Sequence, residues 1–294
     1  MKISYVILHY NAIDVTCACV NSIASIKNAD NCIVIVDNNS PNGSGDELEK
    51  LYSNNDDIYV IKSNSNLGFA RGNNLGYRFA KDNLLSDIIV DMNNDIEILD
   101  HNFENHILET IANYERLGII SPRIKNIKGY DQNPYRIETM STAIKIRTFF
   151  VYSLYFLGLY LPLVNKKLYK HFSIKYHRRE IDHELATTKR MNIVPHGSFI
   201  IFCPSFVKRF RNAFVEDTFF YGEEDILFDM LKKYNLDSLY CPDIEILHKE
   251  KVATATISKD EIKRSRFAAK NKARSAFVCV HHRNFGYLKN LDEK

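Results

Sequence analysis

The chain has 294 residues, 45% of them hydrophobic and 26% charged, and a formal net charge of +3. This composition is that of an ordinary globular protein, and the net charge is too small to indicate a nucleic-acid partner by itself. The six cysteines form neither a CxxC pair nor a disulfide framework, so we expect free thiols in a reducing cytoplasm. Met1 and Lys2 lead straight into a strand-like run, and we expect no signal peptide there.

The first 120 residues alternate strand and helix signals. Short apolar runs predict strands at residues 3–8, 32–36, 58–61 and 88–92. Helical spacing predicts helices between them at residues 15–26, 46–52 and 70–81. This alternation predicts a parallel sheet covered by helices on both faces. Because crossovers in such sheets are right-handed, the loops after the strands should meet at one edge, where open α/β sheets bind ligands.

The pattern changes between Tyr130 and His196. Residues 149–164 are apolar and aromatic, but these sixteen residues are fewer than the ~20 that a membrane-spanning helix needs, and basic residues follow at once. Two interpretations stay open, namely a helix packed on the core or a segment lying on the membrane surface. The later signals predict strands at 195–204 and 238–241, a helix at 224–234 and a basic helix at 260–280.

We therefore predict one catalytic domain over residues 1–250, with an aromatic and basic insertion at about 140–190. A basic helical appendage is expected at residues 251–294. The chain shows no internal repeat and no low-complexity linker that would divide it further.

Three polar residues, Asn93, Asn94 and Asp95, end the apolar run at 88–92. An aspartate at the carboxyl edge of a sheet, among other oxygen ligands, suits a hard divalent cation that shares its shell with a substrate phosphate. Asp37 ends the run at 32–36 in the same way. It could accept a hydrogen bond from a nucleotide, or it could form an Asx-turn that only stops the strand.

A glycine-rich stretch follows the third predicted strand, from Asn66 to Gly76. Gly68 and Gly72 allow close approach of the backbone, and Arg71 can pair with a phosphate. The stretch matches neither GxGxxG nor a Walker loop, so standard dinucleotide and P-loop sites are excluded. The alternative is a helix entry that contains glycine and a surface arginine.

Three successive acids, Glu223, Glu224 and Asp225, follow an aromatic turn at the start of a predicted helix. Acids favour a helix N-terminus for dipole reasons alone, but one of them could also be a general base. His248 could complete a metal shell or could be structural. His9 and His196 are weaker candidates because apolar residues flank them.

Four stretches resemble family 2 glycosyltransferases of the GT-A fold, particularly the bacterial rhamnosyltransferase-like and capsule-polysaccharide members. These stretches are Val6 to Asn11, Asp37 to Gly43, Asn66 to Gly76 with Met92 to Ile96, and Phe219 to Leu227. Together they span nearly all of residues 1–250. The resemblance implies an α/β fold with a mostly parallel, Rossmann-like central sheet, a helical insertion and a C-terminal helix.

The resemblance also implies a reaction and a set of site residues. An inverting enzyme of this family moves a sugar from a nucleoside-diphosphate sugar to a hydroxyl group, with Mg²⁺ or Mn²⁺ held by Asp95, Asn93 and His248. Glu224 matches the catalytic base, where relatives more often have Asp, and Asp225 is its rival. The expected nucleotide-binding residues are Tyr10, Asn11, Asp37, Asn39, Asn66, Gly68, Arg71 and Asn94.

The implied acceptor is a glycan or a polyprenyl-linked glycan in the synthesis of capsule, O-antigen or a similar bacterial surface polysaccharide. We therefore expect a cytoplasmic protein at the inner face of the cell membrane, with peripheral membrane contact and no nucleic-acid partner. Two alternatives stay open. One is a non-catalytic module that binds sugar nucleotides or glycans, and the other is a nucleotidyltransferase, whose glycine-rich signature is missing after residues 3–8.

Overall fold

The computed structural model describes residues 1–134, 136–161, 167, 181–249 and 261–285. Strand and helix alternate in the first part of the chain, as predicted. Its elements are β1 (Ile3–His9), α1 (Ile13–Ala24), β2 (Cys32–Asp37), α2 (Ser44–Tyr52), β3 (Ile58–Lys62), α3 (Gly68–Arg78), the π-helical turn η1 (Phe79–Asn83) and β4 (Ile88–Asn93). Part of the predicted insertion and of the C-terminal appendage lies outside the described residues.

The second part of the chain mixes short strands with helices. Its elements are β5 (Ile96–Ile98), α4 (Phe103–Ala112), β6 (Leu117–Asn126), α5 (Thr142–Gly158), α7 (His183–Thr187), β7 (Arg190–Met191), β8 (Phe199–Phe202), α8 (Pro204–Arg209), α9 (Glu223–Lys233), β9 (Asp237–His248) and α10 (Glu261–Phe285). The predicted helices at 224–234 and 260–280 correspond to α9 and α10. The strand predicted at 238–241 is longer than expected and continues to His248.

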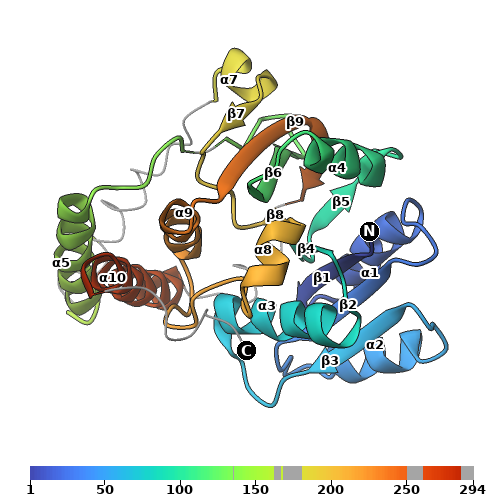
Figure 1. Cartoon of the computed structure of the whole chain (residues 1–294). Helices are drawn as coiled ribbons and strands as arrows, with labels where there is room; N and C mark the ends of the chain where they lie inside the picture. Colours follow the sequence, from blue (N-terminus) through green and yellow to red (C-terminus); the bar gives the residue numbers. More distant parts are fainter. Residues whose placement is uncertain (135, 162–166, 168–180, 250–260, 286–294) are drawn as a thin grey trace.

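One twisted sheet runs through the molecule in the order β3-β2-β1-β4-β8-β6-β9-β5, with β7 paired to β9 (Figure 1). The strands β3, β2, β1 and β4 run parallel to one another, which confirms the prediction for this half. β8 is antiparallel to both β4 and β6, and β5 is antiparallel to β9. The register of β6 on β9 shifts between Pro122 and Arg123, and this bulge lets β9 continue past Pro242.

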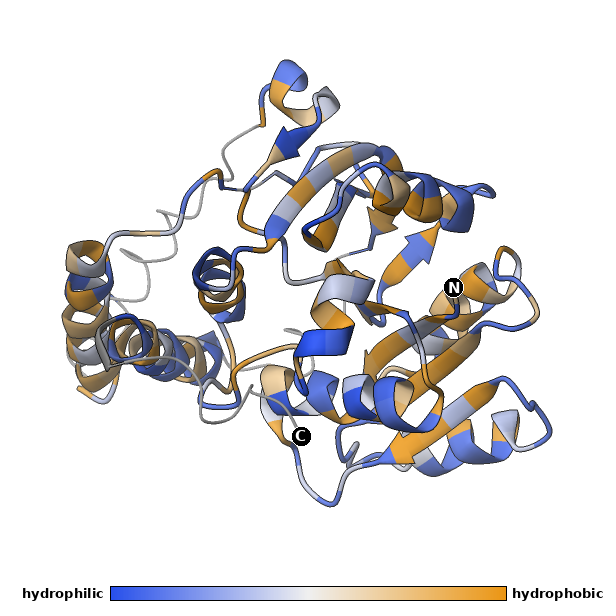
Figure 2. Cartoon of the chain, viewed as in Figure 1, coloured by the Kyte–Doolittle hydropathy of each residue, from blue (hydrophilic) through white to orange (hydrophobic). Residues whose placement is uncertain are grey.

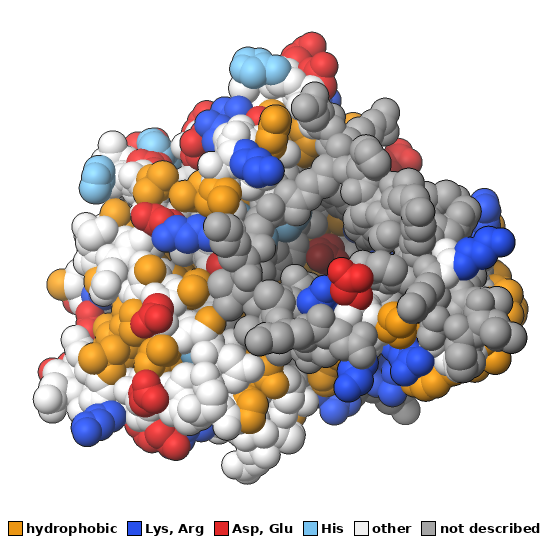
Figure 3. Space-filling model, turned by 180° about the vertical axis from the view of Figure 1, so that it is seen from behind, with side chains coloured by type: hydrophobic (Ala, Val, Ile, Leu, Met, Phe, Trp, Pro, Cys, Tyr) orange, Lys and Arg blue, Asp and Glu red, His pale blue; other side chains and the backbone are white. Residues whose placement is uncertain are grey.

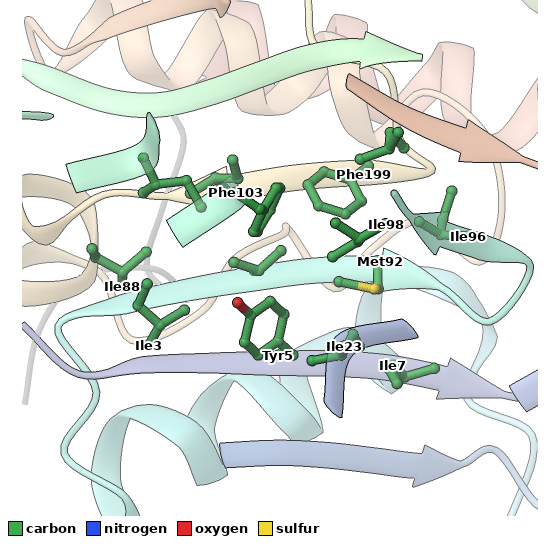
Figure 4. Packing of buried hydrophobic residues seen from close by; sticks show 14 of the residues in the cluster. Ile3, Tyr5, Ile7, Ile23, Ile88, Met92, Ile96, Ile98, Phe103 and Phe199 are labelled. Carbon is green, nitrogen blue, oxygen red and sulfur yellow. The ribbon is translucent and has the colours of Figure 1, made fainter. Parts of the chain in front are cut away.

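Both faces of the sheet are covered, because neighbouring residues of a strand point to opposite sides and both sides are apolar (Figure 2). One core cluster packs Tyr5 and Met92 against Phe103 and Phe199 (Figure 4). The other cluster lies on the opposite face and includes Val6, Val36, Tyr77, Phe202 and Phe206. This two-sided burial explains why the strands read as continuous apolar runs in the sequence.

α5 and α10 pack against each other at one side of the molecule (Figure 1). Tyr155 of α5, Leu159 directly after this helix and Ala269 of α10 form a small separate core. Arg266 lies over the ring of Tyr160 at 4.1 Å and donates to the Leu159 carbonyl at 2.7 Å. Within the described residues, no helix combines the length and the apolar character that crossing a membrane requires.

Candidate active site

The loops that follow β1 and β2 meet at the carboxyl edge of the sheet, as predicted. Tyr10 and Asn11 come directly after β1, and the Asn11 amide donates to Ser40 Oγ at 2.9 Å. Asn42 returns the contact by donating from Nδ2 to the Asn11 carbonyl at 2.7 Å. Asn11 has a left-handed backbone with φ of 65°. The two loops therefore hold each other in place next to the strand ends.

Asp37 is buried and stabilises the turn after β2. Its Oδ1 accepts from the Ser40 amide at 3.2 Å and from Ser40 Oγ at 2.5 Å. This carboxylate therefore forms the Asx-turn that one interpretation predicted, whatever else it binds. Asn39 lies in the same turn, exposed and with φ of 61°.

The glycine-rich stretch is tied to both neighbouring segments of the site. Asn38 accepts from the Leu67 amide at 2.8 Å and donates to the Gly68 carbonyl at 3.1 Å, and Asn66 Oδ1 accepts from the Gly68 amide at 3.0 Å. Gly68 has φ of 78°, and a Cβ there would stand 2.5 Å from the Phe219 carbonyl oxygen. Only glycine fits this position, where residues 66–72 meet the segment before α9.

Arg71 lies on the exposed side of α3, in the same region. Its Nε donates to the Glu216 carbonyl at 3.0 Å, which orients the guanidinium along the segment that leads to α9. The residues before α9 thus contact the glycine-rich stretch at two points, through Arg71 and through the Phe69 amide, which donates to the Phe219 carbonyl at 2.8 Å.

Asp95 lies beside His248 because β5 pairs with the end of β9, where Ile96 is opposite His248. The distance from Asp95 Oδ1 to His248 Nε2 is 3.2 Å, and Asp95 is almost completely buried. The other ring nitrogen, Nδ1, is 2.7 Å from Gln132 Oε1. The structure therefore joins two residues of the predicted metal site that are far apart in the sequence.

The two other residues of the Asn-Asn-Asp run have different surroundings. Asn94 is buried, and its Nδ2 donates to Thr16 Oγ1 at 3.0 Å, so this amide fixes α1 to the end of β4. The Asn93 amide donates to the Ser198 carbonyl at 3.0 Å, which extends the β4–β8 pairing. A cavity of about 160 Å³ opens beside them and is lined by Asp14, Val15, Ala18, Asn94, Asp95, Ile96 and Lys249.

The chemistry of the Asp95–His248 pair fits a divalent cation. In the neutral ring, donation from Nδ1 to Gln132 leaves a lone pair on Nε2, and Asp95 Oδ1 is buried without a hydrogen-bond donor. Two lone pairs at this separation need a proton or a cation between them. Within the described residues, no third Asp, Glu, His or Cys joins them. Further ligands would therefore come from Asn93, water or a phosphate.

Residues Pro195 to Ser198 connect the Asp95–His248 pair with the acids of α9. The ring centroids of His196 and His248 are 6.1 Å apart. On the next residue, Gly197, a Cβ would stand 2.5 Å from Glu224 Oε1, so the carboxylate rests directly against the glycine backbone. Gly197 was missed by the sequence analysis, and the only available signal was a Pro-His-Gly-Ser turn ahead of a strand.

The three acids at the start of α9 occupy three different environments. Asp225 is almost completely buried between two cations, with Arg136 Nη1 at 2.7 Å and Lys145 of α5 in direct contact. Glu223 is buried, and this burial together with the charge of Glu224 raises its pKa to about 8. Burial also raises the pKa of Glu224, the acid that faces Gly197. Sequence order alone gave no sign of Arg136 or Lys145.

Comparison with known proteins identifies the family of the chain. Residues 4–186 match the family described as glycosyl transferase family 2. Over 100 residues the chain is 38% identical to the low-salt glycan biosynthesis hexosyltransferase Agl10 of Haloferax volcanii, a match that covers 34% of this chain and 30% of Agl10.

Two solved structures share the fold at low sequence identity. GalNAc-T7 with UDP, GalNAc and Mn²⁺ superposes with a TM-score of 0.57 at 13% identity, covering 85% of this chain and 44% of GalNAc-T7. S. aureus TarS 1–349 in complex with UDP superposes with a TM-score of 0.53 at 14% identity, covering 96% of this chain and 72% of that TarS chain. The chain therefore spans less than half the length of Agl10 or GalNAc-T7. With its α/β sheet and the match over residues 4–186, the chain has the GT-A fold and belongs to glycosyl transferase family 2.

Proposed function

We propose that the chain is a metal-dependent, inverting hexosyltransferase that moves a sugar from a nucleoside diphosphate to a hydroxyl of a glycan acceptor. The main support is that a pair of candidate cation ligands and a candidate base lie close to the same edge of the sheet. Asp95 Oδ1 and His248 Nε2 lie 3.2 Å apart. Gly197, which lies against the Glu224 carboxylate, directly follows His196, whose ring is 6.1 Å from that of His248 in an edge-on arrangement. A cation site and a carboxylate base so arranged suit the two ends of a displacement at a sugar carbon.

Asp95 and His248, with Asn93, would hold the cation in this proposal. A divalent cation bound there would neutralise the negative charge that develops on the departing diphosphate. The donor nucleotide would lie against the loops after the parallel strands. The residues assigned to that site are Tyr10, Asn11, Asp37, Asn39, Asn66, Gly68, Arg71 and Asn94.

Glu224 is the proposed base. It accepts the proton of the acceptor hydroxyl while that oxygen forms a bond to the anomeric carbon. The bond from this carbon to the diphosphate breaks, its electron pair leaves with the diphosphate oxygen, and one displacement inverts the centre. Because burial raises the pKa of Glu224, the carboxylate is a stronger base than an exposed glutamate. Asp225 is the weaker candidate, since Arg136 and Lys145 already engage its oxygens.

The acceptor and the biological setting are part of the same proposal. We assign the catalytic domain to residues 1–250, with the insertion at about 140–190 and the appendage at 251–294. A polyprenyl-linked glycan of a bacterial surface polysaccharide, such as capsule or O-antigen, would be the acceptor, at the inner face of the membrane. The similarity to Agl10, a hexosyltransferase of low-salt glycan biosynthesis, supports a glycan product in general terms.

A thermal-shift screen tests the donor site. Nucleoside diphosphates and sugar nucleotides are added singly, with and without Mn²⁺ or Mg²⁺. A ligand present at a hundredfold excess over its Kd stabilises the native state by about 2.7 kcal/mol, so one nucleotide should raise the Tm, and more so with the cation. If no nucleotide raises the Tm, the proposal fails. Binding without release of nucleoside diphosphate would leave only a non-catalytic binding module.

A further inference from the structure

The outer face of the α5–α10 pair is an apolar and basic surface close to the proposed base. We propose that this face docks on an anionic lipid surface. We define it by Phe150, Leu154 and Leu157 of α5 and by Lys270 and Arg274 of α10, all of them exposed. The purpose of this docking rests on the proposed function: it would bring Glu224 near an acceptor carried by the membrane.

One side of α5 is apolar and faces the solvent. Phe150, Leu154 and Leu157 are 58%, 69% and 61% exposed, and their spacings of four and three residues put them on one side of the helix. Tyr160 and Leu161, which follow the helix directly, are exposed as well. A run of large apolar side chains in contact with water marks a surface that binds a partner or a membrane.

α10 adds positive charge to this apolar side. It has seven basic residues, Lys263, Arg264, Arg266, Lys270, Lys272, Arg274 and Arg283, against the single acid Glu261. The exposed residues Lys270, Arg274 and Phe277 share one side of the helix through spacings of four and three.

An aromatic contact joins the exposed sides of the two helices. The Phe149 ring lies 5.2 Å from Phe150 and 5.9 Å from Phe277 of α10. Seen from behind, Lys and Arg side chains lie beside hydrophobic ones at the edge formed by these helices (Figure 3). The two sides therefore form one continuous apolar and basic face.

The dimensions and charge of this face favour a lipid surface as its partner. α5 has 17 residues and is ~25 Å long, shorter than the ~30 Å hydrocarbon core, so it suits a position along the interface. Its sequence contains no acid, and apolar residues beside Lys and Arg are typical of segments that bind anionic lipids. A second copy of the chain, docked through the same face, would place like charges together.

The same two helices hold the start of α9. Lys145, on the inner side of α5, is ion-paired with Asp225. Ser275 Oγ of α10 donates to the Phe220 carbonyl at 2.9 Å, and Arg283 Nε donates to Asp229 at 2.6 Å. The acid next to Glu224 therefore lies about one helix diameter, roughly 10 Å, from the proposed lipid surface. Docking would therefore bring the segment that carries the proposed base close to the membrane surface.

Co-sedimentation of the full chain with vesicles tests the inference. Vesicles of phosphatidylcholine, with and without phosphatidylglycerol, are compared at low and high salt. We expect binding only to the anionic vesicles, weaker at high salt. The double variant K270E/R274E should bind about thirtyfold less, at about 1 kcal/mol for each basic residue lost. The affinity of the variant F150S/L154S/L157S for anionic vesicles should fall by at least about tenfold.

Matched controls change exposed residues on other parts of the surface. K50E/K128E reverses two charges and L51S/L99S/I127S replaces three exposed apolar residues, as the test variants do, and both should bind as the wild type does. The inference is overturned if the wild type stays in the supernatant with anionic vesicles at low salt, or if test and control variants bind equally. It is also overturned if light scattering shows a dimer that only F150S/L154S/L157S disrupts.

Nucleoside diphosphate release in vesicle-free solution separates the two proposals. We expect the face variants to release it at the wild-type rate, because the substituted side chains point away from the sheet edge. If the protein binds vesicles but releases no nucleoside diphosphate, the proposed function fails and the docking face stands. If release is normal and vesicle binding is absent, the docking proposal fails alone.

Discussion

The two halves of the sheet hold their polar residues in different ways. Around β1, β2 and α3, neutral amides and hydroxyls bind neighbouring loops, as when Asn38 bridges Leu67 and Gly68. Around α9, buried charges pair across long stretches of chain, as when Lys145 and Arg136 enclose Asp225. The first arrangement fixes the shape of a site through neutral hydrogen bonds, whereas the second holds charges that are removed from water and depend on one another.

This difference predicts where the protein is sensitive to single changes. Loss of one neutral hydrogen bond costs about 0.5–1.5 kcal/mol. Removing one partner of a buried ion pair costs about 3–5 kcal/mol, because the remaining charge is left in a poorly solvated place. Substitutions at the buried ion pairs of α9 should therefore cost more stability than substitutions in the loops after β1 and β2.

The largest effect is expected from Glu224→Gln. The amide keeps the size of the side chain but cannot accept the proton, so turnover should fall by roughly two to four orders of magnitude. Nucleotide binding, measured by thermal shift, should stay close to the wild-type value.

Asp225→Asn is the paired control for that experiment. It leaves Lys145 and Arg136 without their carboxylate, so its main effect should be a loss of about 3–5 kcal/mol in the free energy of unfolding. If Asp225→Asn abolishes turnover in a stable protein while Glu224→Gln remains active, the base is Asp225.

A smaller effect is expected from Gly197→Ala. The added methyl group would displace the Glu224 carboxylate, and a shift of about 1 Å in a catalytic group costs up to about a hundredfold in rate. Stability should change little, because the end of a flexible side chain can move. Gly129→Ala is the control for turnover, since a Cβ at this exposed glycine meets nothing within 4 Å; its φ of 80° is strained for alanine, so this variant should lose some stability but keep its turnover. Equal turnover in both variants would show that Glu224 does not act where the structure holds it.

The smallest effect is a change in the pH dependence of stability in Glu223→Gln. Burial, helped by the charge of Glu224, raises the Glu223 pKa from 4.5 to about 8, so the folded state holds this proton more tightly than the unfolded chain does. The stability from this proton is complete below pH 4.5 and is lost as pH rises toward 8. Urea titrations between pH 5 and 8 should show a flatter dependence in Glu223→Gln than in the wild type. Glu47→Gln, at an exposed position, should keep the wild-type slope, and a wild-type slope in Glu223→Gln would refute the assignment.

Much of the first half could be predicted from the sequence, because its structure depends on short-range patterns. Each buried strand is followed by a polar loop, and parallel strands bring such loops to one edge. Asn94 shows the limit of this reasoning. Its position in the motif predicts nucleotide contact, whereas nothing in the sequence indicates that its amide donates to Thr16 on the neighbouring helix. A local pattern gives the position of a side chain along a strand but not its partner.

Less of the second half could be predicted, because its contacts join distant segments. Lys145 and Asp225 are 80 residues apart, and Gln132 and His248 are 116 apart. Gly197 has no distinguishing feature in the sequence, since its role depends on the approach of Glu224. Which of Glu223, Glu224 and Asp225 can act as the base depends on the surroundings of each side chain, and these follow only from the tertiary structure.

Release of nucleoside diphosphate by the wild type and by Asp95→Ala, with and without Mn²⁺, tests the central claim most directly. The wild type should release the nucleotide from its donor sugar only when the cation is present. Asp95→Ala should show almost no release at any cation concentration, because the buried oxygen facing His248 is gone. Full release by Asp95→Ala, or cation-independent release by the wild type, would contradict the account.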